Sequence, residues 1–326
     1  MSAGPVDRVV DMSVDLAGVR LPAPTMTASG CAAGGREMHR IIDVTRLGAF
    51  VTKSVKAQPM SGRGTPRMAE TPSGMLNAIG LQGPGVETFV EQDLAWLHGI
   101  GARVVVSIAG STASEFAAVA RAVVRSRYAG SVAAIEVNIS CPNVANRGLV
   151  FACDPAGAHK VITLVREEVP RGTPMLAKLS PDVTDVVEIA EVVLRAGAHG
   201  LVMINTTLGV TIDTERLRPH LYAATGGLSG PAIRPTAVRA IWQVAGAMRE
   251  GRLPTAPIVG VGGVRTGRDA LELVAAGASA VQVGTAAFND PTAPQRVADE
   301  LTGLVARHGF DRLADVVGIA HERYPG

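Results

Sequence analysis

The sequence predicts an α/β fold, a (β/α)8 TIM barrel that forms a single domain over residues 1–326. Short apolar segments with the period of a strand alternate with amphipathic segments of helical period along the whole chain. This alternation indicates a parallel sheet, and eight β segments favour a closed barrel over an open sheet. The alternative is a Rossmann-type sheet, but no G-x-G-x-x-G turn follows the first expected strand.

The eight expected strands are short, and helical patterns such as 113–126, 184–197 and 234–250 lie between them. Two long segments, 56–85 and 208–235, are too polar and glycine-rich to be barrel helices. Because long loops in compact domains are usually functional, we expect them to form loop insertions at the C-terminal mouth of the barrel. The expected strands occupy residues 24–29, 49–54, 103–110, 133–140, 175–180, 200–205, 257–263 and 280–286.

Composition excludes several classes of protein. Hydrophobic residues make up 47% of the chain and charged residues 18%, as in a compact globular protein. The net charge of +2 comes without a basic run, so no nucleic-acid partner is expected. The longest apolar stretches are too short to span a bilayer, and aspartates near the N-terminus interrupt any secretory signal. We therefore expect a cytoplasmic protein without a membrane partner.

The cysteines and histidines show no metal-binding pattern. Cys31, Cys141 and Cys153 contain no C-x-x-C pair, which argues against a disulfide scaffold, structural zinc or an iron-sulfur cluster on this chain. None of the seven histidines has the spacing of a metal site. We expect no metal, and we interpret Cys31 and Cys153 as small apolar fillers.

Polar residues and glycines follow most of the expected strands at their carboxyl ends. Barrels of this type place their chemistry at that face, so these residues are expected to meet at one mouth. They are Ser29, Lys53, Ser54, Asn138, Cys141, Lys178, Asn205, Thr206, Gly262, Gly263, Gly284 and Thr285.

Glycines after the last two strands predict a phosphate site. Gly262 and Gly263 follow one strand, and Gly284 with Thr285 follows the next. Unhindered backbone N–H groups near a helix start can face a phosphate, and these barrels often bind one there. The alternative is that both segments are simply tight turns.

Lysine is rare here, because only four of the 31 basic residues are lysines. Lys53 and Lys178 each end an expected strand, and a lysine is seldom fully buried without a partner. Such a point charge suits a ligand carboxylate or a flavin edge that becomes anionic on reduction. Alternatively, both side chains reach a solvated rim.

Four of the six asparagines lie at strand ends or in adjacent loops: Asn77, Asn138, Asn143 and Asn205. Each side chain offers a donor and an acceptor, so together they could recognise the alternating N–H and C=O groups of a pyrimidine-like ring. The alternative is that asparagine favours turns for local reasons. Cys141 follows a strand directly, and a thiol with an ordinary pKa near about 8.5 can accept a proton.

These residues belong to ordered motifs that cover nearly the whole chain. Among them are "FVTKSV" (50–55), "GMLNAIGLQGPG" (74–85), "VNISCPNV" (137–144), "TGGLSGPAI" (225–233) and "VQVGTA" (281–286). In these motifs the chain resembles the class 1 dihydroorotate dehydrogenases. The resemblance implies a (β/α)8 barrel that binds FMN and oxidises dihydroorotate to orotate in de novo pyrimidine (UMP) biosynthesis.

The subclass also follows from the resemblance. The loop base of the family is serine in class 2 and cysteine in class 1, so Cys141 indicates class 1. "LNAIGLQ" (76–82) is similar to subclass 1B, whose catalytic subunit passes electrons to NAD+ through a partner subunit carrying FAD and a [2Fe-2S] cluster. The implied assembly is a homodimer within a heterotetramer.

The resemblance assigns roles to individual residues. Cys141 is the implied base that removes the C5 proton while the C6 hydride moves to N5 of FMN, and 141–151 is an implied lid. Implied substrate ligands are Lys53, Asn77, Ala78, Ile79, Gly80, Leu81, Asn138, Asn143, Asn205 and Thr206. Implied FMN ligands are Ser29, Lys53, Ser54, Asn138, Lys178, Ile204, Gly230, Gly262, Gly263, Gly284 and Thr285.

Three departures from the family pattern leave other functions open. Ser107 stands where an asparagine often contacts the flavin, Gly83 replaces a usual asparagine, and Ala152 with Cys153 alters the lid ending. One alternative is a flavin-dependent dehydrogenase of another dihydropyrimidine. Another is a flavoprotein electron-transfer subunit without catalysis, and a third is a phosphosugar enzyme on the same barrel.

Overall fold

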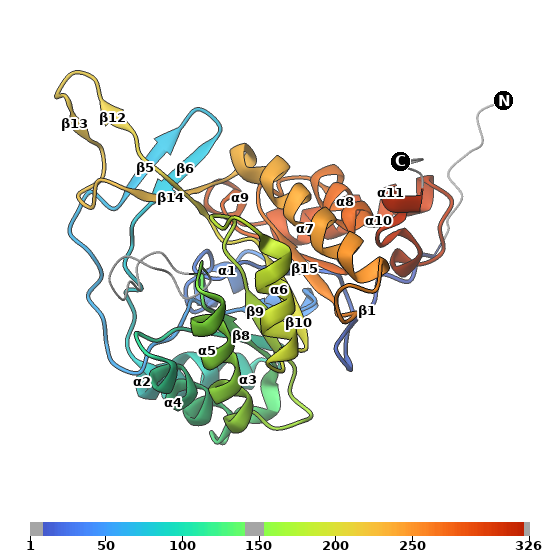
Figure 1. Ribbon diagram of the computed structural model, residues 1–326, viewed down its shortest axis with the longest axis horizontal. Helices are drawn as coiled ribbons and strands as arrows, with labels where there is room; N and C mark the ends of the chain where they lie inside the picture. The colour runs from blue at the N-terminus through green and yellow to red at the C-terminus, as the bar shows by residue number, and fades with distance from the viewer. Residues whose placement is uncertain (1–8, 141–152, 323–326) are drawn as a thin grey trace.

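The computed structural model describes residues 9–140 and 153–322 (Figure 1). Eight parallel strands pair in the order β3-β16-β15-β10-β9-β8-β7-β4. A parallel bridge between Met26 and Ala49 brings the two outer strands together, so the predicted barrel is confirmed. The strands are β3 (Thr25–Thr27), β4 (Phe50–Val51), β7 (Val104–Ile108), β8 (Val132–Asn138), β9 (Met175–Lys178), β10 (Gly200–Met203), β15 (Ile258–Val261) and β16 (Ala280–Val283).

A side chain helps to close the barrel between β3 and β4. The hydroxyl of Thr27 donates to the carbonyl of Val51 at 3.1 Å and accepts from the Val51 N–H at 2.8 Å. The N–H of Gly48 donates to the carbonyl of Thr25 at 2.8 Å. The seam between β3 and β4, defined by Thr25, Thr27, Gly48 and Val51, is therefore held partly by a threonine hydroxyl instead of a full backbone ladder.

Helices surround the barrel and bury the outer face of the parallel sheet, and its inner face is buried inside the barrel, which explains the apolar composition of the strands (Figure 1). In α6, the residues Val186, Ile189, Ala190 and Val193 recur at helical spacing and are all buried. Asp185 begins this helix by accepting hydrogen bonds from two backbone N–H groups of its first turn. Each valine or isoleucine side chain buried in this way contributes about 1.5–3 kcal/mol.

The α-helices are α1 (Arg36–His39), α2 (Val86–Thr88), α3 (Ala95–Gly99), α4 (Ala113–Val124), α5 (Pro155–Glu168), α6 (Val186–Arg195), α7 (Arg234–Arg249), α8 (Gly267–Ala276), α9 (Ala286–Asn289), α10 (Ala293–Arg307) and α11 (Ile319–Glu322). A π-helical turn, Phe89–Leu94, joins α2 to α3, and short 3-10 turns occupy Val44–Arg46, Ala129–Ser131, Pro231–Ile233 and Leu313–Val316. Within the described ranges, no helix combines the length and apolar character needed to cross a membrane.

The two predicted insertions pair with each other. They form an antiparallel sheet in the order β11-β14-β6-β5, which we call the mouth sheet, and a separate hairpin of β12 and β13. Pairing of Asn77 with Gly227 joins the two insertions, which lie 150 residues apart at this contact. The strands are β5 (Met68–Thr71), β6 (Gly74–Asn77), β11 (Thr207–Gly209), β12 (Ile212–Asp213), β13 (Arg218–Pro219) and β14 (Gly226–Ser229).

A hairpin near the N-terminus, β1 (Val14–Leu16) and β2 (Val19–Leu21), was not expected from the sequence. Its side chains Leu16 and Leu21 are completely buried in the main core. The turn between the strands uses Ala17 and Gly18, both with positive φ. The hairpin therefore contributes to the packing of the main core.

Candidate active site

A cavity of about 640 Å³ lies between the barrel mouth and the mouth sheet. Both structures contribute walls, so residues from distant parts of the sequence meet there. Most of the predicted ligand-binding residues line it: Ser29, Lys53, Ser54, Asn77, Ile79, Gly80, Leu81, Asn138, Lys178, Ile204, Asn205, Thr206, Gly230, Gly262, Gly263, Gly284 and Thr285.

Of the three other predicted residues, the structure describes only Ala78, which does not line the cavity. Ala78 is buried in a small separate core with Leu76 and Leu221, and its N–H donates to the carbonyl of Arg67. Cys141 and Asn143 fall outside the described residues, as does the implied lid. The roles of all three stay predictions.

Glycines form one end of the cavity. Gly263 has φ 72°, and a Cβ there would lie 2.7 Å from the Cβ of Arg234, so no other residue fits without strain. Within the described part of the chain, the N–H groups of Gly263 and Gly284 form no hydrogen bond. Thr285 directly precedes α9 and donates its hydroxyl hydrogen to Ser229 at 2.8 Å. The end formed by β15 and β16 thus offers free backbone donors to an anion.

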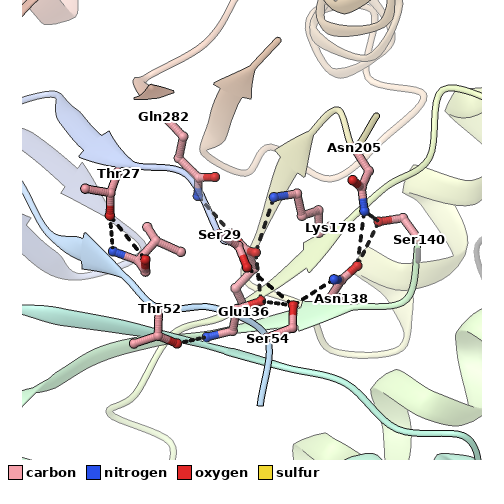
Figure 2. A network of polar contacts seen from close by, with 12 residues as sticks. Thr27, Ser29, Thr52, Ser54, Glu136, Asn138, Ser140, Lys178, Asn205 and Gln282 are labelled. Carbon is pink, nitrogen blue, oxygen red and sulfur yellow. Dashed lines mark hydrogen bonds and ion pairs between the residues drawn. The ribbon is translucent and has the colours of Figure 1, made fainter. Parts of the chain in front are cut away.

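Side-chain amides and hydroxyls form a hydrogen-bonded floor (Figure 2). Asn205 donates its amide hydrogens to Asn138 Oδ1 at 3.3 Å and to Ser140 Oγ at 2.8 Å. Asn138 in turn donates to Ser54 Oγ at 2.8 Å. Asn205 Oδ1 accepts from the N–H of Thr206, which fixes the orientation of the Asn205 amide. Asn138 Oδ1 accepts from Asn205, which fixes the orientation of the Asn138 amide. The floor is therefore held rigidly by neighbouring strand ends.

Lys53 is a half-buried cation in the same cavity. Burial lowers the pKa of Lys53, and the nearby positive charge of Arg67 lowers it further. No carboxylate in the described residues offsets either effect. An anionic ligand is the group that would restore favourable electrostatics here.

Lys178 is placed differently, because it is almost fully buried and paired. Its ammonium lies 3.4 Å from Oε1 of Glu136, whose side chain is completely buried. Glu136 also accepts hydrogen bonds from Ser107 Oγ at 3.0 Å and from Gln282 Nε2 at 2.8 Å. The carboxylate is thus fully hydrogen-bonded, as a buried charge requires.

These features fit the FMN expected from the sequence. Free N–H groups suit its phosphate, and the Lys178 ammonium suits a ring that gains negative charge. Gln282 lines the cavity, and its Oε1 is buried without a partner among the described residues. Cys31 also lines the cavity, and burial raises the pKa of its thiol to about 11, which keeps it uncharged.

Comparison with known proteins identifies the family. A family model described as dihydroorotate dehydrogenase matches residues 11–305. The chain belongs to the dihydroorotate dehydrogenase family. The resemblance seen in the motifs is therefore confirmed.

Curated members of the family match over nearly the whole chain. The catalytic subunit of dihydroorotate dehydrogenase B (NAD(+)) from Geobacter sp. (strain M21) is 47% identical over 308 residues, 94% of this chain and 97% of that protein. The protein of the same description from Citrifermentans bemidjiense has the same identity and coverage. The Pelobacter propionicus protein is 46% identical, with 94% and 98% coverage. These names support the subclass 1B expectation.

Two departures from the family pattern can be located. Ser107 is fully buried and bonds Ser54 Oγ at 2.9 Å and Glu136, so it supports the floor from below and does not line the cavity. Gly83 lines a second cavity of about 460 Å³, which shares Lys53, Ser54, Leu81 and Gln82 with the first. Ser107 therefore does not supply the side chain that the family's asparagine is expected to place against the flavin, while Gly83 lies outside the main cavity wall.

The dihydroorotate dehydrogenase site also contains residues that sequence reasoning missed. Glu136 and Gln282 each interrupt an apolar strand that was expected to be buried. A charged or amide residue in such a strand needs partners, which is a signal that could have revealed them. Glu136 stands two positions before Asn138 and so lies on the same face of β8.

Proposed function

We propose that this chain is the catalytic subunit of a subclass 1B dihydroorotate dehydrogenase that oxidises dihydroorotate to orotate in de novo pyrimidine biosynthesis. One observation carries the proposal: a single cavity joins a lysine and an amide floor to a glycine end. Among the described residues, the lysine has no acidic partner and the N–H groups of Gly263 and Gly284 form no hydrogen bond. Family membership and the names of the relatives support it. The protein would work as a single FMN-binding domain in the cytoplasm.

The proposed cofactor is FMN, which when bound accepts a hydride and so supplies the redox chemistry. Gly262, Gly263, Gly284 and Thr285 would hold its phosphate through backbone N–H groups. Lys178 would stand near the ring and favour negative charge on it. Ser29, Lys53, Ser54, Asn138, Ile204 and Gly230 complete the proposed set, and all of them line the cavity.

The proposed substrate fits the remaining wall. Lys53 would pair with the carboxylate of dihydroorotate, which supplies the negative charge that this lysine lacks among the described residues. Asn77, Asn138, Asn205 and Thr206 would contact the polar edge of the ring, with 78–81 alongside. Asn143 is proposed to join them from beyond the described residues.

Cys141 is the proposed general base. It would take the proton from C5 of the substrate, and the segment 141–151 would exclude water during the transfer. Both assignments come from the family resemblance and from the sequence position of Cys141, three residues after Asn138, the last residue of β8.

The proposed electron acceptor is NAD+, reached through a partner subunit that carries FAD and a [2Fe-2S] cluster. The relatives are named as NAD(+)-linked and as catalytic subunits, which supports a second subunit. The proposed assembly is a homodimer within a heterotetramer. Gel filtration with and without a co-expressed partner would measure it.

The deciding experiment is anaerobic mixing of the purified protein with dihydroorotate while flavin absorbance is followed. Bleaching of the visible flavin band is the expected result. A yellow protein that bleaches with dihydrouracil but not with dihydroorotate would identify another dihydropyrimidine as substrate. A yellow protein that no dihydropyrimidine bleaches would indicate a non-catalytic flavoprotein. A colourless protein that takes up no FMN would contradict the proposal altogether.

A further inference from the structure

Glu136 occupies an unusual position beneath the cavity. Its side chain is completely buried in the barrel and is not part of the cavity wall. Figure 2 shows the carboxylate facing Lys178 and Gln282. The hydroxyl of Ser107 also donates to it, and the three partners come from three other strands. Two of these partners, Lys178 and Gln282, line the cavity, and the third bonds Ser54, which also lines it.

The contacts of Glu136 therefore reach the cavity only through other side chains. Oε1 faces the Lys178 ammonium at 3.4 Å and the Ser107 hydroxyl at 3.0 Å, while Oε2 faces Gln282 Nε2 at 2.8 Å. A carboxylate only accepts hydrogen bonds, so it determines that all three partners donate toward it. Each partner is thereby held in one orientation.

The negative charge of Glu136 also affects the electrostatic potential in the cavity. Among the described residues, Glu136 is the one acidic side chain in ion-pair contact with Lys178. A buried carboxylate next to an ammonium reduces the positive potential that the ammonium presents to anything in the cavity. A molecule that gains negative charge there is stabilised less than it would be by Lys178 alone.

We propose that Glu136 is a positioning residue of the flavin site, which holds the Lys178 ammonium at the cavity wall and limits how strongly it stabilises the reduced, negatively charged flavin. This inference rests on the FMN site of the proposed function. Glu136 touches neither flavin nor substrate and acts through Lys178. Its effect is on the flavin reduction potential.

The test compares Glu136→Gln with the wild-type holoenzyme. The substitution keeps the shape and removes one negative charge, so the potential rises because reduction adds a negative charge nearby. We expect the ratio of reduced to oxidised flavin at a fixed applied potential to increase at least about tenfold. Equilibration with reference dyes measures this ratio. An unchanged or lowered potential would overturn the inference.

The matched control is Glu191→Gln. Glu191 pairs with Arg195 at 2.8 Å on the exposed face of α6, so the same chemical change there should leave the potential unchanged. An equal shift in both variants would mean that overall charge causes the effect, and this would overturn a specific role for Glu136.

A double variant separates action through Lys178 from a purely structural role. Glu136→Gln/Lys178→Met removes both charges and leaves no unpaired charge buried, so it should have a lower potential than Glu136→Gln, which keeps the Lys178 ammonium. Equal potentials in these two variants would mean that the shift does not depend on Lys178, and this would overturn the inference. If Glu136→Gln alone does not fold, the double variant is compared with wild type and should again have the lower potential, because Lys178 lines the cavity and Glu136 does not.

The outcomes distinguish this inference from the proposed function. A wild-type protein that binds FMN but does not oxidise dihydroorotate contradicts the proposed substrate, while the potentials of the variants still decide the role of Glu136. A wild-type protein that takes up no FMN contradicts both.

Discussion

The two sides of the cavity are built in different ways. We call the proposed FMN ligands Lys178, Gly262, Gly263, Gly284 and Thr285 the flavin side, and the proposed substrate ligands Lys53, Asn77, Asn138, Asn205 and Thr206 the substrate side. The flavin side comes from barrel strands, and its lysine is paired with a buried carboxylate. The substrate side draws partly on the mouth sheet, and its lysine has no acidic partner among the described residues.

Under the proposed function, this difference separates a site for a cofactor that stays bound from a site where the substrate supplies the missing negative charge. Lys178 is electrostatically satisfied by the protein itself, as suits a cofactor that stays bound. Lys53 is left partly desolvated beside Arg67, so a ligand carboxylate would gain from its charge. The same residue type thus serves two purposes because of its neighbours.

The largest effect is expected from removal of the proposed general base, which would act on the ligand of the substrate side. Cys141→Ala should lower the rate of dihydroorotate oxidation by about 10²–10⁴-fold, because a general base contributes that much, while FMN and orotate still bind. Stopped-flow reduction of the flavin measures the rate. Cys153→Ala is the control and should keep the wild-type rate. Near-normal reduction in Cys141→Ala would exclude it as the base.

The second largest effect is expected from removal of the positive charge of Lys53. Lys53→Met should weaken orotate binding by about 10–100-fold, since a hydrogen bond to a charged group contributes about 1.5–3 kcal/mol. The flavin spectral change on titration with orotate gives the dissociation constant. Lys160→Met changes an exposed lysine of α5 and should have no effect. Equal affinities in wild type and Lys53→Met would show that the carboxylate binds elsewhere.

The lowered pKa of Lys53 also predicts a pH dependence. Orotate binding requires the ammonium, which in the free protein loses its proton at lower pH than an ordinary lysine. The dissociation constant of orotate should therefore rise as pH increases through that lowered pKa and be constant below it. Lys53→Arg should flatten the curve because arginine stays protonated. A flat wild-type curve across the alkaline range would contradict this electrostatic account.

A backbone change tests the flavin side. Gly263→Ala forces an alanine to φ 72° and into contact with Arg234, so FMN affinity should fall by about tenfold. Gly251→Ala is a matched control, because Gly251 has φ 73° with open space around it. Both variants should lose similar backbone stability, but only Gly263→Ala should bind FMN more weakly in fluorescence titrations. Unchanged affinity would remove Gly263 from the phosphate site.

The smallest effect is expected at the hairpin of β12 and β13, outside both sides. Leu217 is 82% exposed and has φ 51°, a conformation that asparagine tolerates better than leucine. Leu217→Asn should raise the free energy of unfolding by about 0.5 kcal/mol or less and leave FMN and orotate affinities unchanged. Urea unfolding and the two titrations measure this. A large loss of orotate affinity would mean that the hairpin belongs to the substrate side.

The fold and much of the cavity wall were predictable because their signals are local. Strand segments such as 133–140 show their period directly, and β8 occupies Val132–Asn138. Strand-end residues such as Lys178 and Asn205 meet because parallel strands end at one face. Most of the predicted ligand-binding residues therefore line the cavity, but they make up less than half of its wall, and the structure does not test their roles.

The rest depends on contacts between distant segments. Pairing of β6 with β14 across 150 residues created the mouth sheet from segments that were predicted only as loops. The partners of Glu136 lie on three other strands, and no sequence period indicates them. Ala78 was grouped with its neighbours in the sequence, but its side chain turns into a separate small core.

The seam between β3 and β4 links the two sides mechanically. β3 leads to Ser29 and β4 leads to Lys53, so separation of these strands would pull both residues out of the cavity wall. Because the Val51 N–H is held by a single threonine hydroxyl, its deuterium uptake reports local opening at this position. A ligand that contacts both strand ends binds only the closed barrel and so slows that uptake. Because the Thr27 hydroxyl holds this N–H, slower deuterium uptake at Val51 would show that a ligand occupies the cavity.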